Sequence, residues 1–499
     1  MNANTENQKL DISDRTFHLA LAAGAALTVI ANFRFGVQEA GWAAYAPFLA
    51  ALIARSSARA HAWALLYITV GSYLAVSKII TPPIGYAIMS AYAAPQSLVM
   101  LAKVSAAAYI FRRLGAGWGI YFFPALAVSL EWLASFANLG YWSAAGLTQV
   151  DNLPLVQMTT LAGLAGLSYL VAMGSSVTAA VATEGFNKVK IHVAVFAAIF
   201  LAAQAYGQAR LALDAPGKTL RVGLFAAPLP VTKFREILND TRVARQWDDE
   251  YFARAAKAAD LGARVVVWNE AATLMSREEE PAFVERGKAL AVDKGVDMVM
   301  GIGVLLSKAP VTWENKYYWI RKDGSIADVY YKLHPTPFEG SVHASAHPAM
   351  VEVDGLKLTG AICYDYDFPE IALNNASTGA GLAVIPSSDW KGIDPVHSMM
   401  ARLQGVSVGI STVRSVRAAT SYAADQYGRI TGAMRFEDPA GVMVAQVPVE
   451  QVPTIFAATG EVLPWLTSGF CLALLGAAAR RKKDAAPAAV STAPLAQAA

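Results

Sequence analysis

Long runs of apolar residues constrain this chain more than any other feature of its sequence. A helix needs about 20 consecutive apolar residues to cross the hydrocarbon core of a bilayer, and the first two hundred residues contain several runs near that length. One further run occupies residues 462–479. Residues 219–457 alternate apolar and charged segments as a soluble domain does, over a length sufficient for one sizeable core. We therefore expect helices embedded in a membrane, a domain outside the bilayer and one final membrane helix.

The same pattern places the segments. Eight runs are long enough, or nearly so, to cross a bilayer: 15–33, 41–54, 62–80, 86–111, 116–137, 155–183, 191–207 and 462–479. The second run is short and the fourth contains Pro95. The resulting domain prediction is an N-terminal segment 1–14, about seven transmembrane helices over 15–207, the 219–457 domain, a helix 462–479 and a disordered tail 480–499 rich in Ala and Pro.

The positions of the cations predict the orientation, because loops on the cytoplasmic side of a membrane are enriched in Lys and Arg. With a cytoplasmic N-terminus, the outer loops carry little more than Arg34 and Lys78. The inner loops then carry Arg55, Arg59, Arg112, Arg113, Lys188, Lys190 and the basic segment 480–483. We therefore expect a multi-pass protein of the bacterial inner membrane with the 219–457 domain on the periplasmic side.

Composition excludes several classes of protein. Charged residues make up 16% of the chain and hydrophobic residues 55%, a charge deficit typical of membrane proteins. The net charge of +3 is small and dispersed, which argues against nucleic-acid binding. The two cysteines, Cys363 and Cys471, are too few for a disulfide framework. Cys471 falls in the last apolar run, so Cys363 is the one cysteine of the 219–457 domain.

Strand and helix patterns are interleaved through that domain. Strands are predicted at 220–227, 263–269, 297–306, 315–321, 326–332, 349–353, 356–363, 381–386 and 411–423. Helices are predicted at 240–261, 278–294, 368–376 and 396–408. Continuous apolar strands such as 265–267 indicate a buried sheet, so the pattern favours a layered α/β domain. The sequence contains no glycine-rich phosphate loop and no zinc-type Cys/His spacing.

Three predicted strands end abruptly in a reactive side chain: Glu270, Lys332 and Cys363. Strand ends are where an α/β sheet presents functional groups to a crevice. A thiol needs a base to become a nucleophile, and Glu270 would supply it. The ammonium of Lys332 would stabilise the oxyanion of a tetrahedral intermediate at an acyl carbon. Together these residues predict acyl transfer.

Each of the three also has an ordinary structural role. A cysteine at a strand end is more often a small buried hydrophobic residue than a nucleophile. Glu270 fits a helix N-cap or a surface position, and Lys332 would pair with any nearby carboxylate. A free thiol in an oxidising compartment is a liability unless it is used, and this favours a functional Cys363.

At these residues the sequence resembles the nitrilase superfamily of carbon–nitrogen hydrolases, and with its membrane segments it is similar to the apolipoprotein N-acyltransferases. The resemblance covers nearly the whole chain and rests on motifs in matching order: Val267-Trp268-Asn269-Glu270, Tyr331-Lys332-Leu333-His334, Pro337-Phe338-Glu339, Ile362-Cys363-Tyr364-Asp365, Ser388-Asp389-Trp390, His397 and Arg414.

The resemblance implies a multi-span α-helical membrane domain joined to an α/β nitrilase-like αββα sandwich with a Glu270–Lys332–Cys363 triad. Cys363 would attack an acyl ester of a phospholipid and form a thioester. The α-amine of a diacylglyceryl-cysteine at a lipoprotein N-terminus would then take the acyl chain. The implied partners are a phospholipid, a lipoprotein and the bilayer, without nucleic acid, metal or organic cofactor, and we expect a monomer.

Further residues receive weaker predictions from the same motifs. Glu339 and Asp365 are candidates to hold the triad lysine in place or to tune the triad glutamate through like-charge proximity. The amide of Tyr364 is a candidate oxyanion donor, and Phe338 and Trp390 are candidates to line an acyl pocket. Four histidines lack a close ligand pair, and we expect structural roles for them rather than metal binding: His334, His343, His347 and His397.

Some positions depart from the family pattern. Asn269 stands where the family has Pro before the catalytic Glu, Asp365 stands where it has Glu, Glu339 is shifted, and the region around Gln404 differs. These departures do not change the three triad residues, but they leave the identity of the acyl acceptor undetermined. The same triad would also serve an amidase or a transferase acting on another amine or lipid. A catalytically inactive membrane-bound binding module is a third interpretation, which the retained triad disfavours.

Overall fold

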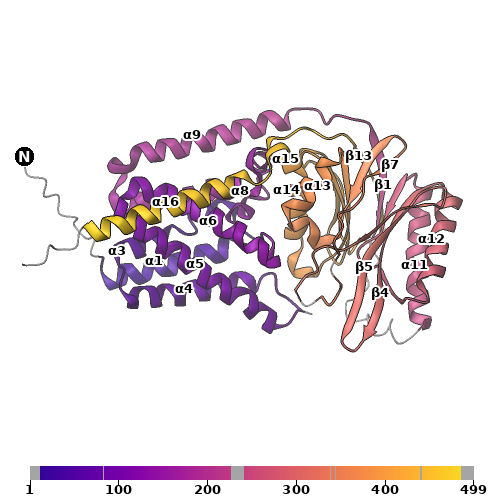
Figure 1. Ribbon diagram of the computed structural model, residues 1–499, viewed down its shortest axis with the longest axis horizontal. Helices are drawn as coiled ribbons and strands as arrows, with labels where there is room; N and C mark the ends of the chain where they lie inside the picture. Colours follow the sequence, from indigo (N-terminus) through magenta and orange to yellow (C-terminus); the bar gives the residue numbers. More distant parts are fainter. Residues whose placement is uncertain are drawn as a thin grey trace, which may run out of the picture.

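The computed structural model describes residues 12–82, 84–225, 241–337, 339–342, 344–438 and 441–484. Phe338 and His343 lie outside these residues, as do nearly all of the predicted N-terminal segment and the tail from residue 485. The described chain forms two parts arranged end to end along the long axis of the molecule, a helical bundle and a two-sheet sandwich (Figure 1).

The helical bundle is built from the N-terminal half of the chain and completed by a helix from the C-terminal end. Its long helices are α1 (Asp14–Ala31), α4 (Ala58–Val76), α5 (Tyr86–Leu114), α6 (Ala116–Ala134), α8 (Thr159–Glu184), α9 (Phe186–Leu211) and α16 (Val462–Asp484). Three short helices lie between them: α2 (Gln38–Gly41), α3 (Ala46–Ala54) and α7 (Leu153–Val156). Most of these helices contribute to one apolar core in which small Ala side chains allow close packing.

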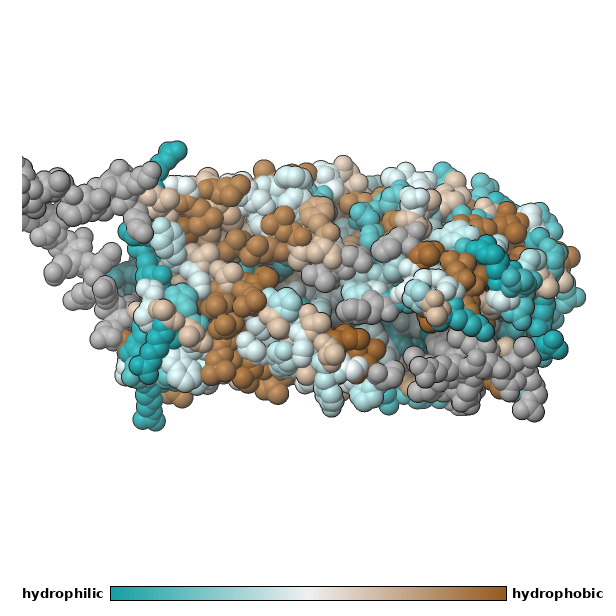
Figure 2. All heavy atoms as spheres, turned by 60° about the horizontal axis from the view of Figure 1, so that its bottom comes forward, coloured by the Kyte–Doolittle hydropathy of each residue, from teal (hydrophilic) through white to brown (hydrophobic). Residues whose placement is uncertain are grey.

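Five of the helices in the described chain are long and apolar enough to cross a membrane: α5, α6 with its continuation to Ala137, α8, α9 and α16. Brown, hydrophobic residues gather over this half of the molecule, and hydrophilic residues cap its far end (Figure 2). The predicted segment 41–54 instead contains α3, which has nine residues. At 1.5 Å per residue α3 is about 14 Å long, so it cannot cross the bilayer by itself.

Two sheets form the second part. The 7-stranded sheet has the order β13 (Val442–Pro448), β1 (Thr219–Phe225), β2 (Val265–Val267), β4 (Asp297–Lys308), β5 (Val311–Ile320) and β6 (Ile326–Tyr331), with β3 (Thr273–Ser276) paired to β4. The 6-stranded sheet has the order β12 (Ile430–Met434), β11 (Ser421–Ala424), β10 (Ser411–Arg417), β9 (Leu382–Ser388), β8 (Leu356–Gly360) and β7 (Val351–Val353). In both sheets the central strands are parallel, so their carboxyl ends meet at one edge.

The sheets pack face to face, and helices cover both outer faces. A core of Val, Leu and aromatic side chains from both sheets fills the space between them. Helices α11 (Thr241–Asp260) and α12 (Glu280–Lys294) cover the outer face of the first sheet. Helices α13 (Pro369–Ser377) and α14 (Val396–Val408) cover that of the second and lie toward the helical bundle, together with α15 (Ile455–Thr459) (Figure 1). This αββα sandwich confirms the predicted fold class.

One predicted strand is two strands in the structure. The segment 411–423 was expected to be continuous, but it forms the β10–β11 hairpin. Nearly every residue in it is buried, so the sequence shows no alternation to reveal the turn. The turn itself passes through Ala418 at φ 61°, where a glycine would have marked it. The short strand β3, the exposed edge strand β12 and strand β13 were not predicted, because they carry little apolar periodicity.

Specific contacts fix the sandwich on the helical bundle. The Trp142 indole donates a hydrogen bond to Asp367 at 2.7 Å, and the Trp390 indole donates one to the carbonyl of Ile79 at 2.6 Å. The Gln157 amide donates to the carbonyl of Tyr427 at 2.8 Å. Since Asp367 and Trp390 are close to Cys363 in sequence or space, these contacts place the thiol near the bundle.

Candidate active site

The three predicted side chains line one cavity. Glu270 follows β2, Lys332 follows β6, and Cys363 follows β8 across the gap between the two sheets. The cavity has a volume of about 400 Å³, and its lining includes all three of them. Each of the three is buried, with at most 4% of its surface exposed. The geometry thus brings together the carboxylate, ammonium and thiol that the sequence singled out.

Lys332 is held between two carboxylates. Its Nζ donates to Glu270 Oε1 at 2.8 Å and to Glu339 Oε2 at 2.7 Å. Asn315 Nδ2 bridges the same pair, with 2.6 Å to Glu270 Oε1 and 2.9 Å to Glu339 Oε1. The amide and hydroxyl of Thr336 complete the shell of Glu339, each at 2.9 Å. Glu339 therefore holds Lys332 in place, one of the two roles considered for it.

This arrangement sets the charges. Burial disfavours the ammonium of Lys332, but the negative charges of Glu270 and Glu339 outweigh it and raise the pKa of Lys332 well above its usual value. Burial likewise opposes the charge of Glu339, yet Lys332 lowers the pKa of Glu339 to about 2. Lys332 is therefore charged at neutral pH.

Within the described residues, one carboxylate oxygen of Glu270 and one ammonium proton of Lys332 have no hydrogen-bond partner. Both hydrogen bonds to Glu270 end on Oε1, and no described residue donates to Oε2. The ammonium has three protons, of which two are directed at carboxylates. The site therefore has one carboxylate oxygen available to accept a proton and one N–H available to donate to an oxyanion.

Cys363 lies at a sharp turn. It begins a 3₁₀ helix (Cys363–Asp367) soon after β8 and has a φ of 49°, a left-handed conformation that is costly for a residue other than glycine. Burial, Glu270 and Asp389 raise the pKa of the thiol well above its usual value, and the cations Lys332 and Arg414 only partly oppose this. The resting thiol is therefore protonated, so attack requires a base.

Asp365 stabilises this turn. Its Oδ2 accepts from the Ile362 amide at 3.2 Å and the Tyr330 hydroxyl at 2.8 Å. Its Oδ1 accepts from the amides of Leu333 at 3.1 Å and His334 at 2.6 Å. Asp365 thus ties the cysteine turn to the backbone beside the lysine. Asp365 was a candidate to contact the triad lysine or glutamate. In the structure its hydrogen bonds go instead to backbone amides and to the Tyr330 hydroxyl.

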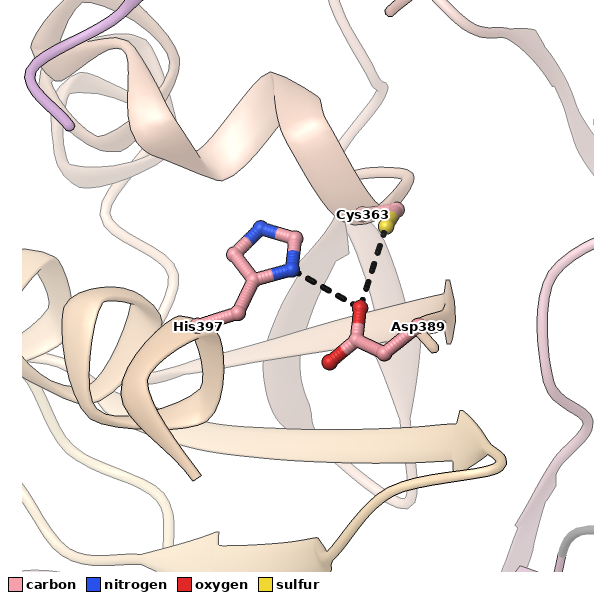
Figure 3. Close-up of side chains that lie close together, drawn as sticks. All are labelled: Cys363, Asp389 and His397. Atoms are coloured by element: carbon pink, nitrogen blue, oxygen red, sulfur yellow. Dashed lines mark hydrogen bonds and ion pairs between the residues drawn. The ribbon is translucent and has the colours of Figure 1, made fainter. Parts of the chain in front are cut away.

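A second buried cluster lies under the thiol. Asp389 Oδ1 is 3.9 Å from the sulfur and 2.8 Å from His397 Nδ1, which also lies 2.8 Å from the Arg414 guanidinium (Figure 3). Arg414 reaches both oxygens of Asp389, at 2.8 and 3.0 Å, and lies 3.8 Å from the sulfur. Burial disfavours a charged imidazole, but Asp367 and Asp389 outweigh it and raise the pKa of His397 to about 9. The same two carboxylates thus favour the charged imidazole and disfavour His397 as the base for the thiol.

Cys363, Asp389 and His397 also have the residue types of a metal site, with their ligand atoms within 4.8 Å of one another. A metal ion there would have to displace the guanidinium of Arg414 from Asp389 and free His397 from its carboxylate partners. The cluster therefore fits a metal poorly. It acts instead as a fixed charge network beside the sulfur.

Family models match both parts of the chain. The carbon-nitrogen hydrolase model matches residues 233–455, which hold all three cavity residues, and the apolipoprotein N-acyltransferase N-terminal domain model matches residues 24–177 in the helical bundle. The helical bundle is thus similar to the N-terminal domain of apolipoprotein N-acyltransferases, and the sandwich is similar to the carbon-nitrogen hydrolases.

Curated apolipoprotein N-acyltransferases are among the relatives of this chain. An apolipoprotein N-acyltransferase of Bradyrhizobium diazoefficiens is 28% identical over 68% of this chain and 70% of that protein. One of Rhizobium meliloti is 27% identical over 76% of this chain and 78% of that protein. Among solved structures, an amidase from Nesterenkonia sp. is 20% identical with a TM-score of 0.39, over 47% of this chain and 93% of that chain. These similarities confirm the resemblance inferred from the motifs.

Two further predicted residues lie beside the site. Trp390 lines the cavity and is pinned to the helical bundle by its hydrogen bond to Ile79. Tyr364 is buried and makes an edge-to-face contact with Phe368 at 5.2 Å between ring centroids. The role of the Tyr364 amide as an oxyanion donor stays a prediction, and Phe338 lies outside the described residues.

Two residues at the site, Asn315 and Arg417, were not predicted from the sequence. Asn315 bridges the two carboxylates around the lysine, and Arg417 lines the cavity. The sequence contains a signal for Asn315, which is a polar residue in a strand rich in aromatic residues. Because side chains alternate along a strand, Asn315 faces the opposite side from its charged neighbours Glu314 and Lys316. Those two pair with each other at 2.7 Å on the other face. Which face holds the site cannot be decided from one strand alone.

Proposed function

We propose that this protein transfers a fatty acyl chain from a phospholipid, through a thioester on Cys363, to the N-terminal amine of a diacylglyceryl-cysteine lipoprotein. Glu270 is the general acid and base, and Lys332 stabilises the oxyanion. The enzyme works in the bacterial inner membrane with its sandwich domain on the periplasmic side. The observation that carries this proposal is that Glu270, Lys332 and Cys363 line one cavity next to the helical bundle.

In the first half-reaction the sulfur attacks the carbonyl carbon of a phospholipid ester, and the thiol proton passes to Glu270 Oε2. The free N–H of Lys332 donates to the oxyanion of the tetrahedral intermediate. Collapse breaks the carbon–oxygen bond of the ester, and Glu270 returns the proton to the departing alkoxide. The products are a lysophospholipid and an acyl thioester on Cys363.

In the second half-reaction the lipoprotein amine attacks the thioester carbon. Glu270 takes a proton from the attacking nitrogen, and the same N–H of Lys332 stabilises the second oxyanion. The carbon–sulfur bond then breaks, an amide forms, and the proton on Glu270 restores the thiol. The high pKa of the Cys363 thiol makes the sulfur a good nucleophile once deprotonated, and the nearby cations Lys332 and Arg414 stabilise the departing thiolate.

The position of the cavity suits lipid substrates. Ile84, which precedes α5, lines it together with Trp390 and apolar residues of the sandwich. Extracting an acyl chain from the bilayer into water costs about 0.8 kcal/mol per CH₂ group. A cavity beside the helical bundle avoids that cost because the chain need not leave apolar surroundings.

The proposal is tested by supplying both substrates. We expect the purified full-length protein, mixed with phospholipid and a synthetic diacylated lipopeptide, to give a triacylated lipopeptide one fatty acyl chain heavier by mass spectrometry. The matched control is the same lipopeptide with an acetylated α-amine, which should remain unmodified. Release of free fatty acid with no acylated lipopeptide would contradict the proposed acceptor and favour a hydrolase.

A further inference from the structure

A lysine is buried inside the helical bundle without a bonded partner. Lys103, in the middle of α5, is 6% exposed. Among the residues that the structure describes, none forms a hydrogen bond or an ion pair with its ammonium. Its one close interaction is with the face of the Tyr45 ring, 5.7 Å from the ring centroid. The active-site lysine differs in this respect, because Lys332 forms ion pairs with two carboxylates.

The side chain lies at a cavity. The cavity has a volume of about 190 Å³ and is lined by residues of α1, α4, α5 and α6 and the segments that follow them. Most of its lining is apolar, and polar side chains are interspersed: Thr28, Asn32, Ser72, Tyr92, Gln96, Glu131 and Ser143. Ala91, Pro95 and Val99 of α5 belong to the wall and are exposed, so the cavity is open on the α5 side.

Glu131 is the one acid in this wall, and it does not neutralise Lys103 by contact. Glu131 is also 6% exposed, and its Oε1 accepts from the Ala145 amide at 3.0 Å. Glu131 and Lys103 interact through space, but the described residues show no ion pair between them. Ionisable residues in a membrane are expensive and mark ligand or ion sites. A cation that faces a cavity without a bonded partner therefore indicates an anionic ligand.

The cavity adjoins the active site. Gly140, in its wall, packs against the turn that begins with Cys363: a Cβ built on Gly140 would lie 3.4 Å from Asp367 and 3.5 Å from the Tyr364 hydroxyl. That turn is also the one fixed by Trp142 through Asp367. The wall of this cavity at Gly140 is thus in contact with the residues that follow the nucleophile.

We propose that this cavity binds the phosphate group of a phospholipid, with the ammonium of Lys103 as its charged donor. The identity of the lipid rests on the proposed function, in which a phospholipid is the acyl donor. A phosphodiester supplies the anion that Lys103 lacks, and the apolar part of the lining suits the adjoining glycerol and acyl chains. Diacylglycerol, which has the same chains and no phosphate, is the matched ligand that the site should reject.

The test measures binding with the full chain carrying Cys363→Ala, so that no acyl transfer consumes the lipid. Native mass spectrometry compares retention of phosphatidylethanolamine with that of diacylglycerol bearing identical chains. We expect Lys103→Met to weaken binding of the phospholipid about 10- to 100-fold, the effect of losing one charged hydrogen bond, and to leave diacylglycerol unchanged. Lys103→Arg should retain the preference for phospholipid over diacylglycerol. Lys78→Met is the control and should also retain it, because the Lys78 ammonium donates to the Val29 carbonyl.

The outcomes separate this site from the proposed function. An unchanged phosphate preference in Lys103→Met overturns the site and leaves acyl transfer by Cys363 standing. Lys103-dependent binding of added inorganic phosphate, without such binding of phospholipid, overturns the lipid assignment. If Lys103→Met does not fold, Lys103→Gln is measured in its place with the same expected loss.

Discussion

Replacing Cys363 with alanine should abolish acyl transfer and leave the protein folded. The thiol lines the same cavity as Glu270 and Lys332 and is the proposed nucleophile, so its loss should remove the covalent route. We expect the rate of triacylated lipopeptide formation to fall by about 10⁴-fold or more. The measurement is the initial rate of product formation with phospholipid and diacylated lipopeptide.

Cys471 provides the matched control. It is the other cysteine of the chain, buried in α16 within the helical bundle, and Cys471→Ala should retain the activity of the unmodified protein. Cys363→Ala at more than a tenth of the original rate would show that sulfur attack is not the route. Equal loss in both variants would indicate damage to the fold rather than to the chemistry.

Replacing Lys332 with methionine should lower both activity and stability. Two carboxylates would remain buried side by side without their shared cation, and breaking a buried ion pair in this way costs about 3–5 kcal/mol. Loss of the oxyanion donor should lower kcat by about 10²- to 10³-fold. The measurements are kcat of the folded protein and the free energy of unfolding.

The pH dependence of stability has a definite sign in this variant. With Lys332 gone, repulsion and burial raise the pKa of the carboxyl pair above the value in the unfolded chain. A carboxyl with a raised pKa destabilises the fold as pH rises above about 4.3. Lys332→Met should therefore gain more stability than the unmodified protein as pH falls from 8 toward 5, because groups such as His397, whose raised pKa also favours the fold at lower pH, contribute equally to both proteins.

Lys316 is the control for this variant. It is equally buried and pairs with Glu280 and Glu314, on the face of β5 that is turned away from the cavity. Lys316→Met should lose comparable stability while the folded fraction keeps its kcat. A Lys332→Met protein with unchanged kcat would remove Lys332 from the mechanism, and equal loss of kcat in both variants would assign the effect to the fold.

The sequence predicted the active-site cavity better than its surroundings. The strand ends at Glu270, Lys332 and Cys363 could be found because an apolar run that stops at a reactive side chain is a local pattern, and parallel strands bring such ends to one edge. No local sequence pattern predicts that these three strand ends, which belong to two different sheets, lie close together. Their proximity depends on sheet-to-sheet packing, for which the family resemblance and not the pattern gave the expectation.

Other features depend on contacts between distant residues. Arg414 and Asp389 are paired across neighbouring strands, and spacing along the chain does not show that they lie under the sulfur. The role of Asp365 likewise follows from backbone amides that become neighbours only in the folded turn. Lys103 lies within an apolar run that predicts a membrane helix, and which way its side chain faces depends on the packing of the helical bundle.

The mass of the protein after exposure to phospholipid alone tests the central claim most directly. With no acceptor present, the thioester should accumulate, and fragmentation should place a mass increase of one fatty acyl chain on Cys363. Addition of the diacylated lipopeptide should discharge it and yield triacylated product. Product formation without any acyl adduct on Cys363, or with the acyl chain on a different residue, would contradict this account.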